Sequence, residues 1–518
     1  MSSQIFLTGS NCWRIERTTR MTVIIDAAEY FRVARDAMLR AREQIILVGW
    51  DVDPRILLDP DDGDGESPNC LAEFIPWLAR ERPDLQINLL IWNMGFIKAL
   101  ARGLSIFTLA RWKLAHNVSM RFDSNHPVGA THHQKILIID DSVALCGGID
   151  MTSDRWDTPE HRDGDPRRRL PGGKPYMPWH DTAGMIEGDA AAALGELARE
   201  RWRRATRREL PCPARHDGIW PEWVEPLLRD REVAISRTVP KGEGIDESRE
   251  IEQLYIDMIE KAQRFIYADN QYFASRRIAE AIAQRLVERK GPEIVIVNPI
   301  SADGWLQEAA MGSARAGLFF ALADLDKHDR FQIYTPVTAA GKPIYVHSKL
   351  MIVDDHILRV GSSNMNNRSM GLDSECDIAI GSIGDGPDPA IRRLRETLMA
   401  EHLGIAPDVV HAAFERTGSL IGTVECLRGK GKTLLPFEPG EWSDTALSIG
   451  ASELLDPESV DQRFEPLSTR GLFKGFLRRG TRQLFDELRI RRRKRRERNR
   501  GRWRRKFREL WDATGADN

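Results

Sequence analysis

The sequence has few cysteines and no long apolar run. Its six cysteines are scattered through 518 residues without a close pair, which fits neither a disulfide framework nor a thiolate metal site. No stretch approaches the roughly 18 consecutive apolar residues that a membrane-spanning helix needs. Residues 1–20 also lack the apolar core of a secretory signal. These absences argue against an integral membrane protein and against Sec-dependent export, and they favour a reducing, cytoplasmic location.

The chain has almost no net charge, but its charge is unevenly distributed. Lys and Arg together number 75 and Asp and Glu 77, with 42% hydrophobic residues. These are the proportions of a globular protein long enough for two or more domains. Residues 471–510 hold 18 Lys or Arg against 4 Asp or Glu. We therefore expect any contact with a polyanionic surface at the C-terminal end.

A similar order of helices and strands is predicted twice along the chain. An amphipathic helix over Ala27–Glu43 precedes an apolar strand at 45–50, and a helix over 251–263 precedes a strand at 265–268. The parallel continues through strands at 86–92 and 293–297, helices at 97–114 and 306–325, strands at 118–122 and 331–334, and closing pairs of strands at 135–139 with 143–146 and at 349–353 with 357–360. This order indicates an internal repeat with an offset of about two hundred residues.

The repeat predicts an α/β protein made of two homologous α/β halves. Each half is expected to be a mixed sheet covered by helices, and the halves to pack about a pseudo-two-fold axis with one shared active site. Prolines interrupt any long helix between 207 and 249, so we expect the boundary there. The expected division is an N-terminal extension (1–24), a first half (25–210), a linker (211–245), a second half (246–425), a connector (426–470) and a basic amphipathic tail (471–518).

The same polar motif closes each half. The first copy is His133-Gln134-Lys135, four residues, Asp140 and then Gly147-Gly148-Ile149-Asp150; the second is His347-Ser348-Lys349, four residues, Asp354 and then Gly361-Ser362-Ser363-Asn364. In a strand, residues i and i+2 project to the same face, so each histidine is expected beside its lysine. One copy alone would fit an exposed polar pair, whereas two copies with the same spacing indicate an active site.

Two histidine–lysine pairs that converge on one pocket are suited to phosphodiester chemistry. The lysines would neutralise the non-bridging oxygens of the anion, while one histidine attacks phosphorus and the other protonates the leaving oxygen. Asn364 and small residues such as Gly148 and Ser362 would allow close backbone approach and supply neutral donors. We expect no metal and no cofactor, because no carboxylate cluster or His/Cys group with metal-ligand spacing is evident in the sequence.

These motifs resemble the phospholipase D superfamily, whose signature is a paired His-x-Lys-x4-Asp motif followed by Gly-Gly/Ser-x-Asn/Asp. The resemblance to its eukaryotic-type subgroup covers residues 25–425, through segments that include Arg155 to His161, Pro178 to Asp181, Asn270 to Phe273 and Asn367 to Met370. It implies hydrolysis or transfer at the head-group phosphodiester of a glycerophospholipid. The reaction would pass through a phosphohistidine and give phosphatidic acid and an alcohol.

The resemblance also implies a role for each site residue. His133 would be the nucleophile and His347 the general acid, although the two-fold arrangement also allows the reverse. Asp181 would orient His133 and Glu375 would orient His347, with Asp373 or Asp377 as substitutes for Glu375. Asp140 and Asp354 are expected to brace strands and lysines rather than touch substrate. The expected site comprises catalytic-motif residues His133, Lys135, Asp140, His347, Lys349 and Asp354, phosphate-binding residues Gly148, Asp150, Ser362, Asn364, Asn270 and Gln271, and orienting residues Asp181 and Glu375.

The C-terminal tail combines many arginines with aromatic residues at helical spacing, among them Trp503, Phe507 and Trp511. Such a stretch is typical of a helix that lies on an anionic membrane. We therefore expect peripheral membrane association; a solvated tail and a nucleic-acid-binding segment are the alternatives. The alternative functions are a cardiolipin synthase-like phosphatidyltransferase, a nuclease and a catalytically silent lipid-binding protein. The oligomeric state is left open, with a monomer as the working expectation.

Overall fold

The computed structural model describes residues 5–62, 65–93, 112, 114–242, 244–301, 311–384, 386–439, 456 and 481–513. Side chains of the last helix are described from 489 to 505. The expected helix at 97–114 therefore lies almost entirely outside the described residues. Residues 440–455 and 457–480 of the expected connector and tail also lie outside them.

Both halves consist of alternating strands and helices. The elements up to the boundary are β1 (Arg14–Ile25), α1 (Ala27–Arg40), β2 (Gln44–Gly49), α2 (Leu71–Glu81), β3 (Gln86–Trp92), β4 (Val118–Asp123), β5 (Ile136–Ile139), β6 (Val143–Gly147), β7 (Trp179–His180), β8 (Thr182–Gly188), α5 (Asp189–Thr206) and β9 (Leu228–Val239). Those that follow are β10 (Ser248–Arg249), α6 (Glu250–Lys261), β11 (Phe265–Asn270), α7 (Arg276–Val287), β12 (Glu293–Val297), α9 (Ser313–Leu325), β13 (Phe331–Val337), β14 (Tyr345–Val346), β15 (Lys349–Val353), β16 (Ile357–Gly361), η3 (Arg368–Leu372), β17 (Glu375–Gly381), α10 (Pro389–Leu403), α11 (Pro407–Thr417), α12 (Leu420–Leu427), β18 (Thr433–Pro436) and α14 (Thr481–Ala513).

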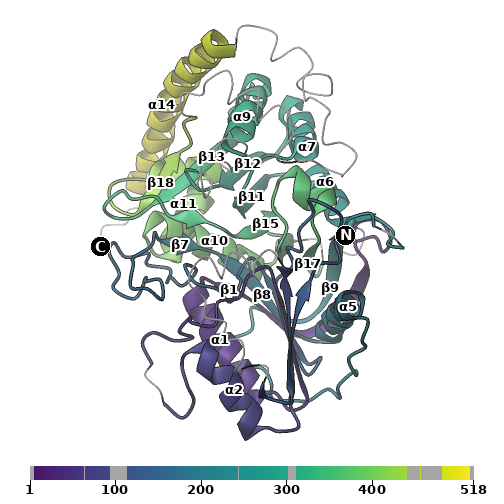
Figure 1. Ribbon diagram of the computed structural model, residues 1–518. Helices are drawn as coiled ribbons and strands as arrows, with labels where there is room; N and C mark the ends of the chain where they lie inside the picture. Colours follow the sequence, from purple (N-terminus) through teal and green to yellow (C-terminus); the bar gives the residue numbers. More distant parts are fainter. Residues whose placement is uncertain are drawn as a thin grey trace.

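One mixed sheet runs through the whole molecule (Figure 1), in the order β18-β13-β12-β11-β15-β16-β17-β9-β1-β8-β6-β5-β2-β3-β4. In the first half β2, β3 and β4 are parallel neighbours, and β2, β5, β6 and β8 are antiparallel neighbours. In the second half β11, β12 and β13 repeat the parallel part, and β11, β15, β16 and β17 repeat the antiparallel part. The predicted α/β fold with two repeated halves is therefore confirmed.

Helices cover both faces of this sheet, because its strands are apolar on both sides. In β2, Ile46 faces the same core as Leu194 of α5, whereas Ile45 faces the helices α1 and α2. That first core also contains Ile235 of β9 and Leu394 of α10, so it extends across both halves. In the second half α6, α7 and α9 cover the other face. The two halves thus share one layer of core.

Two strands at the centre of the sheet come from segments expected to lie outside the halves. β1 falls within the expected N-terminal extension, and β9 falls within the expected linker. β1 pairs with β8 and β9, and β9 also pairs with β17, which belongs to the second half. These strands carry several charged residues, for example in the run RIERTTRM at 14–21, so their sequences lack a clear apolar pattern. Through these pairs β1 and β9 make the sheet continuous from one half to the other, in addition to connecting the halves along the chain.

The helix α14 lies against the second half (Figure 1), beside α9, α11 and α12. Arg492 donates to the backbone carbonyl of Phe331, and its guanidinium lies 4.3 Å from the ring centroid of Phe319. Trp503 packs on α12 so closely that a Cβ on Gly422 would lie 3.1 Å from its ring. One face of the expected tail is thus seated on the protein. None of the helices in the described part of the chain is both long and apolar enough to cross a membrane.

Candidate active site

The two motif segments meet at the seam between the halves, where each is held by the other half. The backbone N–H of His133 donates to the carbonyl of Ser374 at 3.0 Å, and that of His347 donates to the carbonyl of His180 at 2.7 Å. The short strand β14, which precedes His347, pairs in parallel with β7, which precedes Asp181. Each motif histidine therefore lies beside a backbone segment of the opposite half.

Each histidine also contacts a carboxylate of the opposite half. His133 Nδ1 lies 2.9 and 3.0 Å from the two carboxylate oxygens of Glu375, and His347 Nδ1 lies 2.7 Å from Asp181 Oδ2. The expected pairing of Asp181 with His133 and of Glu375 with His347 is therefore wrong: the two carboxylates are exchanged. The physical reason is the backbone pairing between halves, which reasoning within each half does not predict. Because Nδ1 is occupied, Nε2 is the ring nitrogen left for a substrate.

The two lysines are buried and have different partners. Lys135 Nζ lies 3.2 Å from Asp150 Oδ2 and donates to the carbonyl of His133. Lys349 Nζ donates to Gln271 Oε1 at 3.1 Å and to the carbonyl of His347. Asp150 and Gln271 were expected to bind phosphate, but in the structure they position the lysines. One lysine is thus paired with a carboxylate and the other with a neutral amide.

Burial and neighbouring cations lower the pKa of both imidazoles. Burial, together with Lys135 and Lys349, holds the pKa of His133 well below its usual range. Burial, Lys349 and Arg155 also lower the pKa of His347, and Lys135 of the first half lowers it further. A neutral imidazole keeps the lone pair that a nucleophile needs. The two histidine–lysine pairs are therefore close enough to influence one another electrostatically, as a shared site requires.

Two other groups in the site have shifted protonation equilibria. Burial lowers the pKa of Lys349 to about 7; Asp181 opposes this effect and Lys135 adds to it. Burial raises the pKa of Glu375 to about 8, although hydrogen bonds from Ser362 and Ser369 favour its charged form. Both groups therefore titrate near neutral pH, which is common at functional sites.

Three of the expected phosphate-binding residues, Gly148, Ser362 and Asn270, contact other residues of the site. A Cβ on Gly148 would lie 2.1 Å from Asp181 Oδ1, so only glycine leaves room for this carboxylate. Ser362 donates to Glu375, and Asn270 accepts from the backbone N–H of Met365 at 3.0 Å. In the structure these residues position other groups of the site. Asn364 differs, because its side-chain oxygen is buried and has no hydrogen-bond partner in the described part of the chain.

Asp140 and Asp354 perform the same structural task in the two halves. Asp140 accepts from the backbone N–H groups of three consecutive residues, 42–44, at 2.6 to 2.9 Å. Asp354 accepts from those of residues 263–265 at 2.6 to 2.8 Å. They brace the entries to β2 and β11 as expected, but they do not brace the lysines. Although they belong to the motif, they are not in contact with the histidines or the lysines.

Aromatic rings flank both histidines; Trp179 belongs to a segment that carries the family resemblance, but none of these rings was among the expected site residues. The Trp50 ring lies 6.4 Å from that of His133 and stacks on Trp92 at 5.7 Å. The Trp179 ring lies 5.2 Å from that of His347 and stacks on Tyr345 at 4.5 Å. Trp50 directly follows an apolar strand, a position that could have marked it. These rings provide apolar walls beside both reacting centres.

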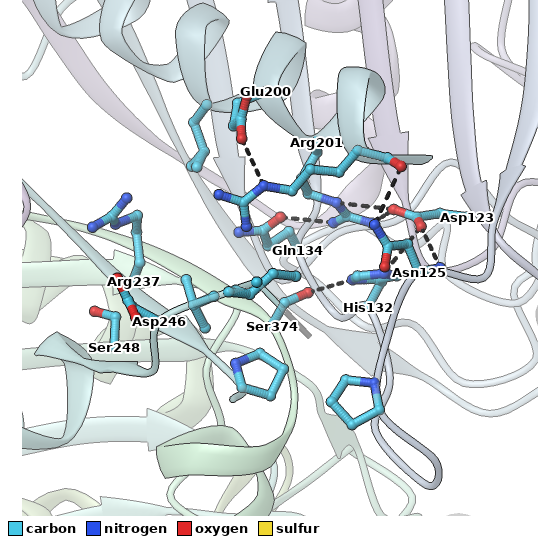
Figure 2. Close-up of a pocket in the computed structure, with 17 residues that line it drawn as sticks. Asp123, Asn125, His132, Gln134, Glu200, Arg201, Arg237, Asp246, Ser248 and Ser374 are labelled. Carbon is cyan, nitrogen blue, oxygen red and sulfur yellow. Dashed lines mark hydrogen bonds and ion pairs between the residues drawn. The ribbon is translucent and has the colours of Figure 1, made fainter. Parts of the chain in front are cut away.

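A cavity of about 310 Å³ lies behind the His133 segment (Figure 2). It is lined by His132 and Gln134, whose side chains alternate along the backbone with those of His133 and Lys135 and so point to the other side. Arg201 also lines it, but its guanidinium already donates to Gln134 Oε1 at 2.7 Å and to Asp123 Oδ2 at 2.9 Å. This hydrogen-bond network fixes the motif segment on the side opposite to His133 and Lys135.

A second buried cluster lies next to the site. Asp26, His161, His180 and Glu401 each place a potential ligand atom within 4.8 Å of those of the others. The sequence shows no group with metal-ligand spacing, but the fold brings these four side chains together. The four residues come from four separate segments, so no sequence spacing reveals them.

The fold and site define a two-half α/β protein with one composite histidine–lysine centre. The phospholipase D family model matches residues 37–216 and 324–419, more than half of the chain. The chain therefore belongs to the phospholipase D family.

Curated relatives include phospholipase D alpha 4 of Arabidopsis thaliana, which is 24% identical over 76% of this chain and 65% of that protein. Phospholipase D A of Dictyostelium discoideum is 25% identical over 74% of this chain and 36% of that protein. Phospholipase D1 of Saccharomyces cerevisiae is 25% identical over 75% of this chain and 29% of that protein. The chain thus spans between 29% and 65% of the length of these relatives.

Two solved structures are also similar to this chain. Phosphatidylserine synthase of Haemophilus influenzae Rd KW20 has a TM-score of 0.49 and 14% identity, over 74% of this chain and 85% of that one. Polyphosphate kinase of Porphyromonas gingivalis has a TM-score of 0.40 and 10% identity, over 74% of this chain and 50% of that one.

Proposed function

We propose that this chain cleaves the head-group phosphodiester of glycerophospholipids and transfers the phosphatidyl group to water or to another alcohol. The observation that carries the proposal is the reciprocal arrangement where the two halves meet: each motif histidine contacts a carboxylate of the opposite half, beside two buried lysines. Membership of the phospholipase D family supports the choice of a phospholipid as substrate. Hydrolysis would release phosphatidic acid and the head-group alcohol.

In the first step, Nε2 of His133 attacks phosphorus, and the bond from phosphorus to the head-group oxygen breaks. His347 gives its Nε2 proton to that oxygen, so the head group leaves with a neutral hydroxyl group. The lysines lower the pKa of His347 in the free protein. The negative charge of the bound phosphodiester offsets the effect of the lysines and raises the pKa of His347, so the ring can carry this proton. The product of the step is a phosphatidyl group bound to His133.

In the second step, His347 takes a proton from water or an alcohol, which attacks the phosphohistidine. The bond from phosphorus to nitrogen breaks and His133 is regenerated. Glu375 and Asp181 stabilise the positive charge that develops on the ring beside each of them. Lys135 and Lys349 balance the charge on the non-bridging oxygens. The near-symmetry of the two pairs leaves the reverse assignment of His133 and His347 as the alternative.

The proposal is tested with the purified chain and vesicles of phosphatidylcholine, phosphatidylethanolamine or phosphatidylglycerol, with and without ethanol. We expect phosphatidic acid without ethanol and phosphatidylethanol with it. His133→Ala and His347→Ala should each abolish turnover while the far-ultraviolet circular dichroism stays unchanged. His411→Ala is the matched control, because its imidazole also contacts a glutamate, Glu396, but is 45% exposed and far along the chain from the motifs. Normal rates in either motif variant would overturn the proposed roles.

The identity of the nucleophile is tested by stopping the reaction rapidly in alkali and locating the label that remains on the chain. Substrate labelled with ³²P in the phosphate should leave an alkali-stable, acid-labile label on the chain, and peptide mapping should place it at His133. A label at His347 would reverse the assignment.

The same assay separates the alternative functions. A cardiolipin synthase-like enzyme would form a phosphatidyl product with a second lipid alcohol in preference to water. Nicked plasmid DNA without lipid turnover would identify a nuclease. Lipid binding without turnover in the unaltered chain would identify a lipid-binding protein.

We also propose that the exposed face of α14 contacts an anionic membrane surface. Arg495 and Arg496 turn to the protein, where they pair with Asp329 and Glu438. Lys494, Arg498 and Arg505 are exposed on the other side of the helix. A cationic face of this kind is attracted to anionic lipids, including phosphatidic acid, the expected product.

A further inference from the structure

We propose that Asp26, His161, His180 and Glu401 bind one divalent transition-metal ion, with zinc as the first candidate. The first three residues belong to the first half, and Glu401 lies near the end of α10 in the second half. Side chains of Asp26, His161 and His180 are completely buried, and that of Glu401 is 3% exposed. The site is distinct from the histidine–lysine centre and plays no part in the proposed reaction steps.

The distances between the potential ligand atoms fit a single ion. His180 Nδ1 lies 2.7 Å from Glu401 Oε1 and 3.1 Å from Asp26 Oδ1. His161 Nε2 lies 3.0 Å from Glu401 Oε1 and 3.7 Å from Asp26 Oδ2. A tetrahedral zinc ion with bonds of about 2.0–2.1 Å separates its ligand atoms by about 3.3 Å, a value that lies within this range. Two imidazoles and two carboxylates are also a common ligand set for zinc.

Both imidazoles have a carboxylate at the nitrogen that faces away from the proposed ion. His161 Nδ1 lies 2.9 Å from Asp157 Oδ2, and His180 Nε2 lies 3.4 Å from Asp269 Oδ2. Asp157 is itself fixed by Arg168, at 2.9 and 3.0 Å. Metal-binding histidines typically donate their second N–H to a carboxylate, which fixes the tautomer and the ring orientation. His161 therefore has the hydrogen-bonded carboxylate that is typical of a metal ligand, whereas Asp269 lies near His180 Nε2 without hydrogen-bond geometry.

Several polar atoms of the cluster are buried without a hydrogen bond. They are Asp26 Oδ2, Glu401 Oε2 and both ring nitrogens of His180. His180 Nδ1 is thus close to two carboxylates but has hydrogen-bond geometry with neither. Leaving such atoms unsatisfied in the protein interior costs free energy, whereas coordination to an ion would satisfy Asp26 Oδ2, Glu401 Oε2 and His180 Nδ1.

Charge balance also favours a cation at this position. Asp26, Asp157, Asp269 and Glu401 supply four carboxylates within one buried region. The guanidinium of Arg168 compensates the charge of Asp157. The ammonium of Lys432 interacts electrostatically with Glu401 and Asp26 and donates to the carbonyl of Pro159. A divalent ion would neutralise Asp26 and Glu401 with both imidazoles neutral. The competing explanation is a network of protonated imidazoles that pair with the same carboxylates.

The ion would link the two halves next to the histidine–lysine centre. His180 is followed in the chain by Asp181, the carboxylate that contacts His347. The carbonyl of His180 also accepts from the N–H of His347. Coordination of the His180 ring would therefore fix the backbone on which the second histidine depends.

The first test measures metal content in the full-length chain, produced without a histidine tag and dialysed against metal-free buffer. Inductively coupled plasma mass spectrometry should find about one zinc ion per chain, as expected for a structural site. His161→Asn and Glu401→Gln should retain less than about a tenth of that amount. His216→Asn is the matched control, because His216 also pairs with a glutamate, Glu43, but at the surface, and it should keep the full amount. Stoichiometric cobalt, iron or manganese would support the site and change only the element.

A second measurement uses the unaltered chain, so it does not depend on how the variants fold. The chain is stripped of metal with dipicolinate, and its melting temperature is measured before and after addition of zinc chloride. Zinc should raise the melting temperature, and X-ray absorption should show nitrogen and oxygen ligands without sulfur. The proposal is overturned if the purified chain contains less than about a tenth of an equivalent of any transition metal and zinc chloride leaves its melting temperature unchanged.

Discussion

Glu375 and Asp181 each act on a histidine that belongs to the other half of the chain. Their contacts of 2.9 and 2.7 Å to Nδ1 fix which ring nitrogen faces the substrate. A carboxylate in this position also stabilises the imidazolium that forms during proton transfer. The two residues are therefore expected to contribute to the chemical step more than to substrate binding.

Glu375→Gln and Asp181→Asn are each expected to lower kcat by about 10²- to 10⁴-fold with little change in KM, because an amide can hold the wrong tautomer and cannot ionise to stabilise the imidazolium. Initial rates on vesicles give both constants. Asp408→Asn is the control: this carboxylate pairs with Arg393 at 2.6 Å on the surface of the protein. Its variant should stay within about threefold of the unaltered rate. Unchanged kcat in Glu375→Gln would remove this residue from the mechanism.

The pKa of Lys349 predicts how the rate depends on pH. Burial lowers this pKa to about 7, so the ammonium loses its proton as the pH rises through that value. A neutral amine attracts the phosphodiester less, and kcat/KM should therefore fall between pH 7 and pH 9. Ionisation of Glu375 acts in the opposite sense, because its pKa is raised to about 8.

The variant Lys349→Arg separates these two contributions. Its guanidinium remains charged throughout this range, so the alkaline decline should disappear even if the rate is lower overall. Measured kcat/KM from pH 6 to pH 9 for both proteins is the check. A decline of the same size in the arginine variant would assign it to another group.

At the scale of elements, α14 has an inward face that contacts the protein and an outward face that is cationic. Lys494→Glu, Arg498→Glu and Arg505→Glu together reverse three exposed charges. Because each charge near an anionic surface contributes about 1 kcal/mol, binding to phosphatidic acid vesicles should weaken by more than about tenfold at low salt. The difference should shrink at high salt. Vesicle co-sedimentation at two salt concentrations measures both effects, and equal binding would contradict the proposed membrane contact.

The inward face supplies the matched control for this experiment. Arg492 lies over the Phe319 ring and donates to the carbonyl of Phe331. Arg492→Ala should lower the free energy of unfolding by about 1–2 kcal/mol, since it removes a cation–π contact and a hydrogen bond. Its binding to vesicles should stay close to normal. Denaturant unfolding and co-sedimentation together distinguish the two faces.

Elements with a strong local pattern could be predicted from the sequence, and those defined by partners could not. The apolar run at 45–50 and the paired motifs at His133 and His347 gave the strands, the repeat and the composite site. β1 was missed because its charged residues hide its apolar positions. The partners of Glu375 and Asp181 were exchanged because backbone pairing between distant segments leaves no trace in local spacing. The cluster around His180 was missed for the same reason.

At the scale of the whole molecule, the halves share strands and core. β9 joins β1 to β17, and one core contains Leu194 of the first half and Leu394 of the second. Neither half can therefore unfold without exposing apolar surface of the other. Calorimetry of the unaltered chain should show the two halves unfolding in one cooperative transition, with calorimetric and van't Hoff enthalpies that agree. Two resolved transitions for residues of the two halves would show that they are thermodynamically separate.

The exchange of carboxylates between the halves has a consequence for the origin of the chain. A half-length ancestor with one motif would have carried a histidine on one surface and the carboxylate for a different histidine on another. Such a polypeptide could complete its dyads only by associating with a second copy of itself, and this association would have produced two dyads at once. Duplication and fusion of such a gene would have made a concentration-dependent homodimer permanent, and it would have allowed the two lysine environments to diverge, one towards Asp150 and the other towards Gln271.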